Sequence, residues 1–270
     1  TSSTEVSSPP AAVDDADAID AAGLAADLAG PGLGPVESRN DVTSTNDELA
    51  AAARAGAGEG RVLGAAHQVE GRGRRGRAWV DRPGAGLAVS VLVRPHRDDH
   101  LSSASPIVAG VATAEAIGDH ARLAWPNDVL VDGRKVAGVL VEAGSSGGGV
   151  EWVVIGIGVN VRGVPTVPDA RWPPGANDGS GPAPRRGVLV ADVLTRLWER
   201  IAECRRVGLG PVLAAWERRD ALRGRQVQVR VGADTVSGTA AGVDGEGRLL
   251  LHGPGGVIAL ASAEVVRVDS

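Results

Sequence analysis

Residues 125–142 read WPNDVLVDGRKVAGVLVE, and this segment gives the clearest indication of the fold. Pro126 interrupts an extended run, and the dipeptide Asp132-Gly133 favours a tight hairpin turn. The return strand begins at Lys135. The segment therefore predicts two antiparallel strands joined by a short turn.

The same hairpin carries three polar side chains of different chemistry. Asn127, Asp128 and Lys135 bring an amide, a carboxylate and the only lysine of the chain into one short segment. This combination suits a metal-bound polyphosphate, because Mg²⁺ prefers oxygen ligands and an ammonium attracts phosphate. A purely structural hairpin is the alternative.

Extended segments on both sides of this hairpin predict a larger sheet. They follow one another with few helices between them, which indicates a mixed, largely antiparallel sheet with helices on one face, an α+β fold. The expected strands are residues 61–68, 86–94, 122–125, 129–131, 136–142 and 151–161, and the expected helices are 19–28, 102–120, 188–206 and 211–222, with an irregular loop over 162–186.

Composition divides the chain of 270 residues into three parts. The first 18 residues are rich in Ser, Pro, Ala and Asp and predict a disordered tail. From residue 224 onward, short apolar runs alternate with Gly-rich turns, which predicts a small all-β barrel. We therefore expect a tail (1–18), a main domain (19–222) and a C-terminal barrel (223–270).

Charge and cysteine content restrict the class of protein. The net charge is −5, so no general nucleic-acid footprint is expected. Cys204 is the only cysteine, which fits a reducing compartment, and its place in a predicted helix indicates an inert thiol. No secretory signal or long apolar run occurs, so we expect a cytoplasmic protein without a membrane span.

The segment GRGRRGRAW, residues 71–79, combines four arginines with three glycines. Glycine lets a backbone approach a ligand closely, and arginine is suited to phosphate or carboxylate, so the segment predicts an anion-binding loop. Gly71, Gly73 and Gly76 also match the spacing of a dinucleotide-binding turn, but a strand rather than a helix follows them. A solvated basic turn is the remaining alternative.

Two further segments contain candidate ligand contacts. Ser44, Thr45 and Asn46 precede an Ala-rich helix with the spacing of a capping box, and helix capping alone explains them. In VVIGIGVNV, residues 153–161, alternate glycines in a strand indicate close approach by a ligand or another backbone. Asn160, at the end of this strand, either hydrogen-bonds to a base or ribose edge of a ligand or stabilises the turn that follows the strand.

Taken together and in this order, TSTND, the strand ending at Gln68, GRGRRGR, WPNDVLVDGRKVAGVLVE, GIGVNV and the terminal barrel resemble the biotin protein ligase family over residues 34–270. The resemblance implies a catalytic domain distantly like class II aminoacyl-tRNA synthetases and a C-terminal barrel like SH3 domains. It also implies the monofunctional type, without a DNA-binding domain.

The resemblance assigns the biotin ureido ring to Ser44, Thr45 and Gln68, with help from Arg72 and its backbone. Trp79 would pack against biotin, and residues 86–89 would form part of the pocket wall. Asn46, Gly71, Gly73, Asn127 and Gly138 complete the implied set of ligand-binding residues.

The implied reaction has two steps. The biotin carboxylate attacks the α-phosphate of ATP in the presence of Mg²⁺, and a lysine of a biotin carboxyl carrier domain of an acyl-CoA carboxylase then attacks the biotinyl-adenylate. Arg74, Arg77 and Lys135 are the candidates for the phosphates, Asn160 for adenine and Asp128 for the incoming lysine. The residues that bind the metal stay open.

One residue departs from the resemblance. A lysine is expected immediately before WPND, at a point that contacts both the biotin carboxyl and the α-phosphate, but this chain has Ala124. We therefore expect slow adenylation, which Arg122 is poorly placed to restore. A weakened biotin or adenylate binder and a lipoate or octanoyl ligase are the alternatives, and either a monomer or a weak homodimer is expected.

Overall fold

The computed structural model describes residues 32–80, 84–96, 100–147, 149–163, 165–167, 172–177 and 185–269. The predicted tail and the predicted helix over 19–28 lie outside these residues, as does part of the predicted loop over 162–186.

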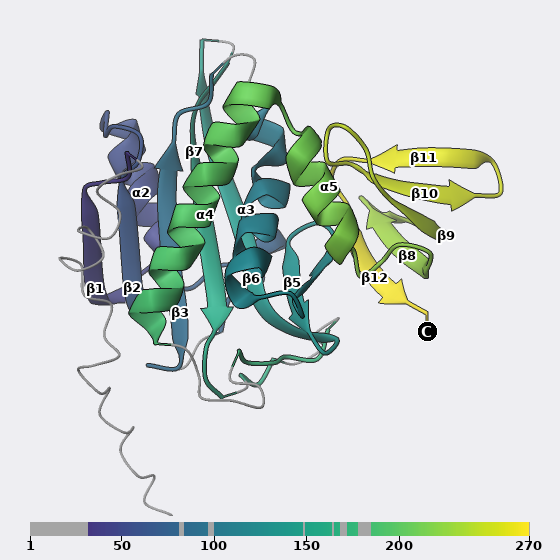
Figure 1. Cartoon of the computed structure of the whole chain (residues 1–270), viewed down its shortest axis with the longest axis horizontal. Helices are drawn as coiled ribbons and strands as arrows, with labels where there is room; N and C mark the ends of the chain where they lie inside the picture. The colour runs from purple at the N-terminus through teal and green to yellow at the C-terminus, as the bar shows by residue number, and fades with distance from the viewer. Residues whose placement is uncertain are drawn as a thin grey trace, which may run out of the picture.

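A seven-stranded sheet forms the centre of the main unit (Figure 1). The strand order is β1-β2-β3-β7-β6-β5-β4, and only the β1–β2 pair is parallel. The predicted mixed, largely antiparallel sheet is thus confirmed. The strands are β1 (Val36–Val42), β2 (Val62–Gln68), β3 (Gly86–Val93), β4 (Arg122–Ala124), β5 (Asp128–Val131), β6 (Arg134–Ser146) and β7 (Gly149–Asn160).

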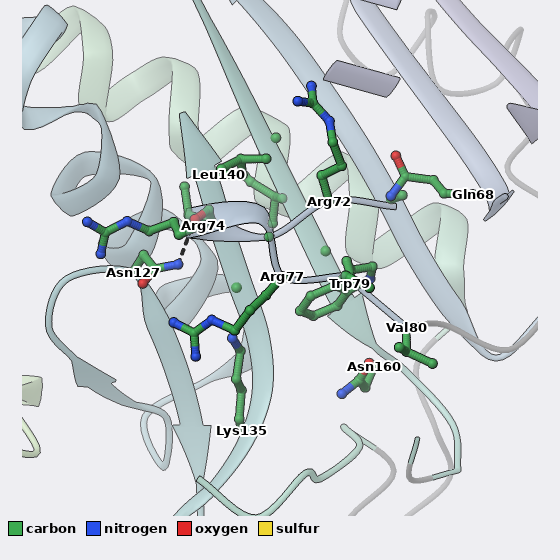
Figure 2. A pocket seen from close by; sticks show the side chains of 18 of the residues that line it. Gln68, Arg72, Arg74, Arg77, Trp79, Val80, Asn127, Lys135, Leu140 and Asn160 are labelled. Atoms are coloured by element: carbon green, nitrogen blue, oxygen red, sulfur yellow. Dashed lines mark hydrogen bonds between the residues drawn. The ribbon is translucent and has the colours of Figure 1, made fainter. Parts of the chain in front are cut away.

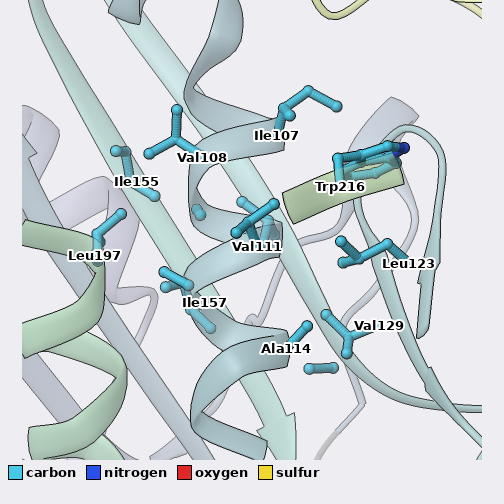
Figure 3. Close-up of a cluster of buried hydrophobic side chains, with 14 of the residues drawn as sticks. Ile107, Val108, Val111, Ala114, Leu123, Val129, Ile155, Ile157, Leu197 and Trp216 are labelled. Carbon is cyan, nitrogen blue, oxygen red and sulfur yellow. The ribbon is translucent and has the colours of Figure 1, made fainter. Parts of the chain in front are cut away.

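Helices cover both faces of this sheet, so the expectation of helices on one face is wrong. Along β7, Ile155 and Ile157 pack into the large core with the helices α3, α4 and α5 (Figure 3), whereas Trp152 and Val154 pack with Leu49 of α2. Because side chains alternate along a strand, α2 lies on the face opposite to the other three helices. The helices are α2 (Thr45–Arg54), α3 (Leu101–Ile117), α4 (Arg186–Val207) and α5 (Gly210–Arg219).

The hairpin predicted from residues 125–142 is confirmed. Val131 pairs with Arg134, and the two turn residues between them have positive φ, 49° at Asp132 and 71° at Gly133. A two-residue turn with this geometry matches the right-handed twist of the strands that it joins. The hairpin therefore fixes β5 against β6, the strand that begins just before Lys135.

Strand β1 was not expected from the sequence. It reads VESRNDV and lies at the edge of the sheet, with its middle exposed to solvent. Its backbone pairs with β2 alone, while Glu37 forms ion pairs with Arg39 and with Arg61. These two guanidinium groups lower the pKa of Glu37. An edge strand buries few side chains, so polar residues replace the alternating pattern that predicts a strand.

The C-terminal residues form a second, five-stranded antiparallel sheet with the order β11-β10-β9-β8-β12. It lies beside α5 (Figure 1), and its Leu249 and Val229 join the large core. Trp125 also donates from Nε1 to the carbonyl of Gly247, at 3.0 Å. The strands are β8 (Gln226–Val231), β9 (Asp234–Val243), β10 (Leu249–Gly253), β11 (Gly256–Leu260) and β12 (Glu264–Val268).

Two smaller predictions concern the core and membranes. Cys204 is buried among apolar side chains of α4, as its predicted inertness requires. Over the residues that the structure describes, none of the helices combines the length and the apolarity needed to cross a bilayer.

Candidate functional site

A pocket of about 1190 Å³, including its open mouth, lies on the face of the sheet that carries α2. The start of α2, the segment 71–79, and strands β6 and β7 form its walls. All but one of the predicted site residues line it: Ser44, Thr45, Asn46, Gln68, Arg72, Gly73, Arg74, Arg77, Trp79, Asn127, Asp128, Lys135, Gly138 and Asn160. The exception is Gly71.

Gly71 closes the base of the segment 71–79, which we call the arginine loop. Trp79 donates its backbone N–H to the Gly71 carbonyl, at 2.8 Å. A Cβ atom on Gly71 would lie 2.7 Å from the Trp79 carbonyl oxygen, so only glycine allows this closure. The glycine is therefore required by the shape of the loop, and its contact with a ligand stays a prediction.

The first turn of α2 meets Gln68 at what we call the amide end of the pocket. Ser44 caps the helix by accepting a hydrogen bond from the Asp47 N–H, at 3.4 Å. Thr45 donates to Gln68 Oε1 from both its backbone N–H, at 2.8 Å, and its hydroxyl, at 3.1 Å. Because two donors fix the Gln68 oxygen, the amide nitrogen Nε2 keeps its donors for a ligand.

Ser90 supports this end from behind. Its hydroxyl is fully buried in β3 and lies 2.7 Å from both Thr45 Oγ1 and Asn46 Oδ1. Asn46 in turn donates from Nδ2 to Glu142 Oε2, at 2.9 Å. Sequence reasoning missed both Ser90 and Glu142, and the only signal was a lone serine in the apolar run GLAVSVLV.

Arg72 closes the rim of the amide end. Its guanidinium forms an ion pair with Asp47 and donates to both oxygens of Glu142, at 2.9 and 3.1 Å. The family resemblance placed Arg72 near the residues assigned to the ureido ring, and in the structure Arg72 lies at the amide end beside these residues. Two carboxylates, those of Asp47 and Glu142, therefore orient the Arg72 guanidinium.

Glycines in β6 and β7 leave room for side chains of the site. A Cβ atom on Gly156 would lie 2.1 Å from Asn46 Oδ1, and one on Gly158 would lie 2.5 Å from the Trp79 indole. A Cβ atom on Gly138 would lie 3.2 Å from the same indole. The expected approach of a ligand or a backbone to Gly156 and Gly158 is thus an approach by side chains, and the Trp79 indole packs against Gly138 and Gly158.

Arg74, Arg77 and Lys135 gather at the other end, which we call the cationic end (Figure 2). Lys135 Nζ lies 2.6 Å from a carboxylate oxygen of Asp128, which is buried. It also lies 5.6 Å from the centroid of the Trp79 ring, within reach of a cation–π interaction. Asp128 and Trp79 together hold the only lysine of the chain at the pocket wall.

Asn127 and Asn160, like Asn46, have structural partners as well as a place in the pocket wall. Asn127 donates from Nδ2 to the Val139 carbonyl, at 2.8 Å, and Asn160 donates from Nδ2 to the Gly175 carbonyl, at 2.9 Å. Asn127 thus joins β5 to β6, and Asn160 joins the end of β7 to the segment 172–177. Each side-chain amide therefore uses one N–H donor for a backbone carbonyl of the fold. Both side chains still line the pocket.

The expectation about Ala124 is wrong. Ala124 is fully buried in the large core and is absent from the pocket wall, so a lysine there would not meet two anionic reactants. Lys135 occupies the wall instead. Arg122 is exposed and donates to the backbone carbonyls of Asp119 and Ala121, at 2.7 and 3.0 Å.

Comparison with known proteins agrees with this arrangement. The family described as biotin/lipoate A/B protein ligase matches residues 37–160, and the biotin protein ligase C-terminal domain matches residues 223–268. A biotin–acetyl-CoA-carboxylase ligase of Paracoccus denitrificans is 38% identical over 235 residues, which cover 82% of this chain and 96% of the relative. One of Mycobacterium tuberculosis is 34% identical over 256 residues, covering 89% and 91%.

Solved structures share the fold. The biotin protein ligase of Aquifex aeolicus in complex with biotin and ATP superposes with a TM-score of 0.72 at 24% identity, over 86% of this chain and 98% of that one. Identity at this level supports the architecture alone, whereas the closer sequence relatives identify the family. On that evidence, the chain belongs to the biotin protein ligase family.

Proposed function

We propose that this chain activates biotin with ATP, forming biotinyl-5′-AMP and pyrophosphate, and then transfers biotin to a lysine of a biotin carboxyl carrier domain. One observation carries the proposal: a single pocket joins an end rich in fixed amide and hydroxyl groups to an end rich in cations. Biotin has a neutral ureido ring and a carboxylate, and ATP is a polyanion. The relative of known structure was solved with both ligands.

Thr45 and Gln68 are suited to the ureido ring. The Gln68 oxygen is occupied by Thr45, so the amide of Gln68 offers N–H donors to the ureido carbonyl. A ligand without a matching acceptor would leave these partly buried donors unpaired, at a cost of about 1–3 kcal/mol. This penalty accounts for selectivity between biotin and purely apolar acids. Trp79 supplies an apolar surface for the rest of the molecule.

In the first step, an oxygen of the biotin carboxylate attacks the α-phosphorus and pyrophosphate leaves. Two anions must meet, so the protein lowers the barrier by positioning and by neutralising charge. Lys135 is the first candidate for this task, because Asp128 and Trp79 hold its ammonium in place. Arg74 and Arg77 are the candidates for the remaining phosphate charge.

Magnesium is part of the same proposal. Asp128 offers a carboxylate and Asn127 an amide oxygen, and Mg²⁺ bound to nucleotides takes one or two such ligands with phosphates and water. Within the residues described, no three His, Cys, Asp or Glu side chains converge on a common point. These donors fit an ion held mainly by the nucleotide, which would neutralise phosphate charge when bound.

In the second step, the amine of the carrier lysine attacks the acyl carbon of the adenylate and AMP leaves. Asp128 is the candidate to orient the amine or to accept its proton, and Asn160 is the candidate for adenine. The carrier is expected to belong to an acyl-CoA carboxylase, and we expect the reaction in the cytoplasm, by a monomer or a weak homodimer.

Biotin-dependent release of pyrophosphate tests the proposal. We expect the purified chain with ATP and Mg²⁺ to release pyrophosphate when biotin is added, and to attach biotin to a carrier domain that retains its target lysine. Lipoate and octanoate serve as controls, since ligases of the same family use them. Release with either control but not with biotin would contradict the proposal.

A further inference from the structure

Glu264, the first residue of β12, links the C-terminal sheet to the arginine loop. Its Oε1 lies 2.6 Å from Arg77 Nη2, and its Oε2 lies 3.3 Å from Arg75 Nη1. The loop and β12 are far apart in sequence, so this contact depends on the arrangement of the two sheets. Each oxygen of one carboxylate thus holds a different arginine of the loop.

The setting of Glu264 makes these contacts stronger than ordinary surface ion pairs. Its side chain is 16% exposed, whereas those of Arg75 and Arg77 are 34% and 55% exposed. Arg230, its neighbour across the β8–β12 pair, lies 3.7 Å from Oε2. A carboxylate so sheltered from water gains more from charged donors than an exposed one does.

Arg77 can hold Glu264 and a phosphate at the same time. A guanidinium carries five N–H donors in a fixed plane, and the contact with Glu264 uses one of its nitrogens. Arg77 and Lys135 both line the pocket, and Figure 2 shows both side chains. Glu264 therefore fixes the direction of Arg77 without withdrawing it from the pocket.

The tip of the arginine loop needs such a support. Arg75 has a left-handed backbone, with φ of 57°, which is unfavourable for a residue other than glycine. The next residue, Gly76, also has positive φ, 72°. Four arginines on one short loop repel one another, and the bond from Arg75 to Glu264 compensates charge at the strained residue.

We propose that Glu264 is a positioning residue for adenylation, which holds Arg77 and the loop tip in place for the phosphates of ATP. The C-terminal sheet then contributes to the nucleotide site, although none of its described residues lines the pocket. This inference rests on the function proposed above, and it adds a residue whose role is to orient another.

Steady-state kinetics of the full chain with Glu264→Gln test the inference. The amide keeps the shape of the side chain but loses its charge, so we expect KM for ATP to rise about tenfold, the factor that one charge-assisted contact supplies. Biotin affinity and the melting temperature should stay near those of the parent. Arg230→Gln is the matched control, because it removes the partner of Glu264 that lies outside the loop, and we expect less than a twofold change.

Trypsin cleavage of the ligand-free loop gives a second readout that needs no activity. Mass spectrometry of the cuts after Arg74, Arg75 and Arg77 should show cleavage at least fivefold faster in Glu264→Gln than in the parent or Arg230→Gln, since an unheld loop opens more often. Should the parent release no pyrophosphate, the proposed function fails, and the cleavage rates alone decide this inference. Unchanged KM and cleavage would overturn it, as would a lower KM for ATP, which would mean that Glu264 competes with phosphate.

Discussion

At the amide end of the pocket the polar groups are buried and bonded to one another, whereas at the cationic end long side chains reach into solvent and are held by ion pairs. Thr45, Asn46 and Ser90 are almost inaccessible to water. Arg77 and Lys135 keep much of their side-chain surface exposed. The pocket therefore combines the amide end, whose fixed polar groups hydrogen-bond to a ligand, with the cationic end, whose longer side chains supply positive charge.

This difference has an energetic meaning. A buried donor or acceptor that loses its partner costs about 1–3 kcal/mol, whereas Arg77 and Lys135 keep part of their surface in water, which screens their pairs with Glu264 and Asp128. Substitution at the amide end should therefore weaken binding. Substitution at the cationic end should chiefly slow the chemistry, because the cations act on charge that develops in the transition state.

Replacing Lys135 should have the largest effect. We expect Lys135→Gln to slow biotin-dependent pyrophosphate release about 10²- to 10³-fold, the usual loss when one preorganised electrostatic donor is removed. Biotin affinity, measured by isothermal titration without ATP, should change less than about threefold, since the hydrogen bonds of the amide end remain. A release rate within threefold of the parent would assign the charge to Arg74 and Arg77 instead.

Ala124→Lys tests whether the core position matters to the chemistry. The side chain at 124 is surrounded by core residues, so an ammonium there would be buried without a described partner and should cost at least about 2 kcal/mol of unfolding free energy. We expect a lower urea midpoint and no gain in the rate of pyrophosphate release. A stable variant with a faster rate would restore the expectation drawn from the sequence.

Ser90→Ala tests the amide end from behind the pocket. Loss of the hydroxyl leaves Asn46 Oδ1 and Thr45 Oγ1 without their buried partner, so Gln68 should be less well oriented. We expect biotin affinity to fall about tenfold by isothermal titration, within the range for a buried hydrogen bond. Ser90→Thr, which keeps the hydroxyl, is the control, and equal losses in both variants would point to packing rather than hydrogen bonding.

Arg122→Ala should have the smallest effect. This side chain is exposed and bonds only to nearby backbone carbonyls among the contacts described, so its loss should change stability by less than about 0.5 kcal/mol. We expect the rate of pyrophosphate release to stay within about twofold of the parent. A loss comparable to that of Lys135→Gln would show that Arg122 reaches the reactants after all.

Local sequence patterns predicted the hairpin, most strands and the four helices α2 to α5, because turns and periodic apolar residues act over short distances. Local motifs together with the family resemblance predicted the polar residues that line the pocket, and Gln68 entered through the resemblance alone. Strand β1 escaped prediction because an edge strand can be polar. The lysine expected at position 124 was misplaced because a motif position does not say which face of β4 a side chain occupies.

Residues that act at a distance were not predictable in this way. Ser90 meets Thr45, Glu142 meets Arg72, and Glu264 meets Arg77, in each case across different elements of the fold. Glu142 ends the segment 125–142, but the local pattern does not show which side chain it will meet, and Ser90 and Glu264 lie outside the segments singled out for ligand contacts. Only the pairing of strands and the placement of the C-terminal sheet bring them to the site.

Pyrophosphate-release kinetics of the double variant Ser90→Ala/Lys135→Gln, beside both single variants, test most directly whether the two ends act separately. Their described partners do not overlap: Ser90 bonds to Thr45 and Asn46, and Lys135 contacts Asp128 and Trp79. Independent sites are additive within about 0.5 kcal/mol, so the loss in kcat/KM for biotin should equal the product of the single losses within about twofold. A double variant no worse than Lys135→Gln alone would contradict this account, because it would mean that both residues serve one task.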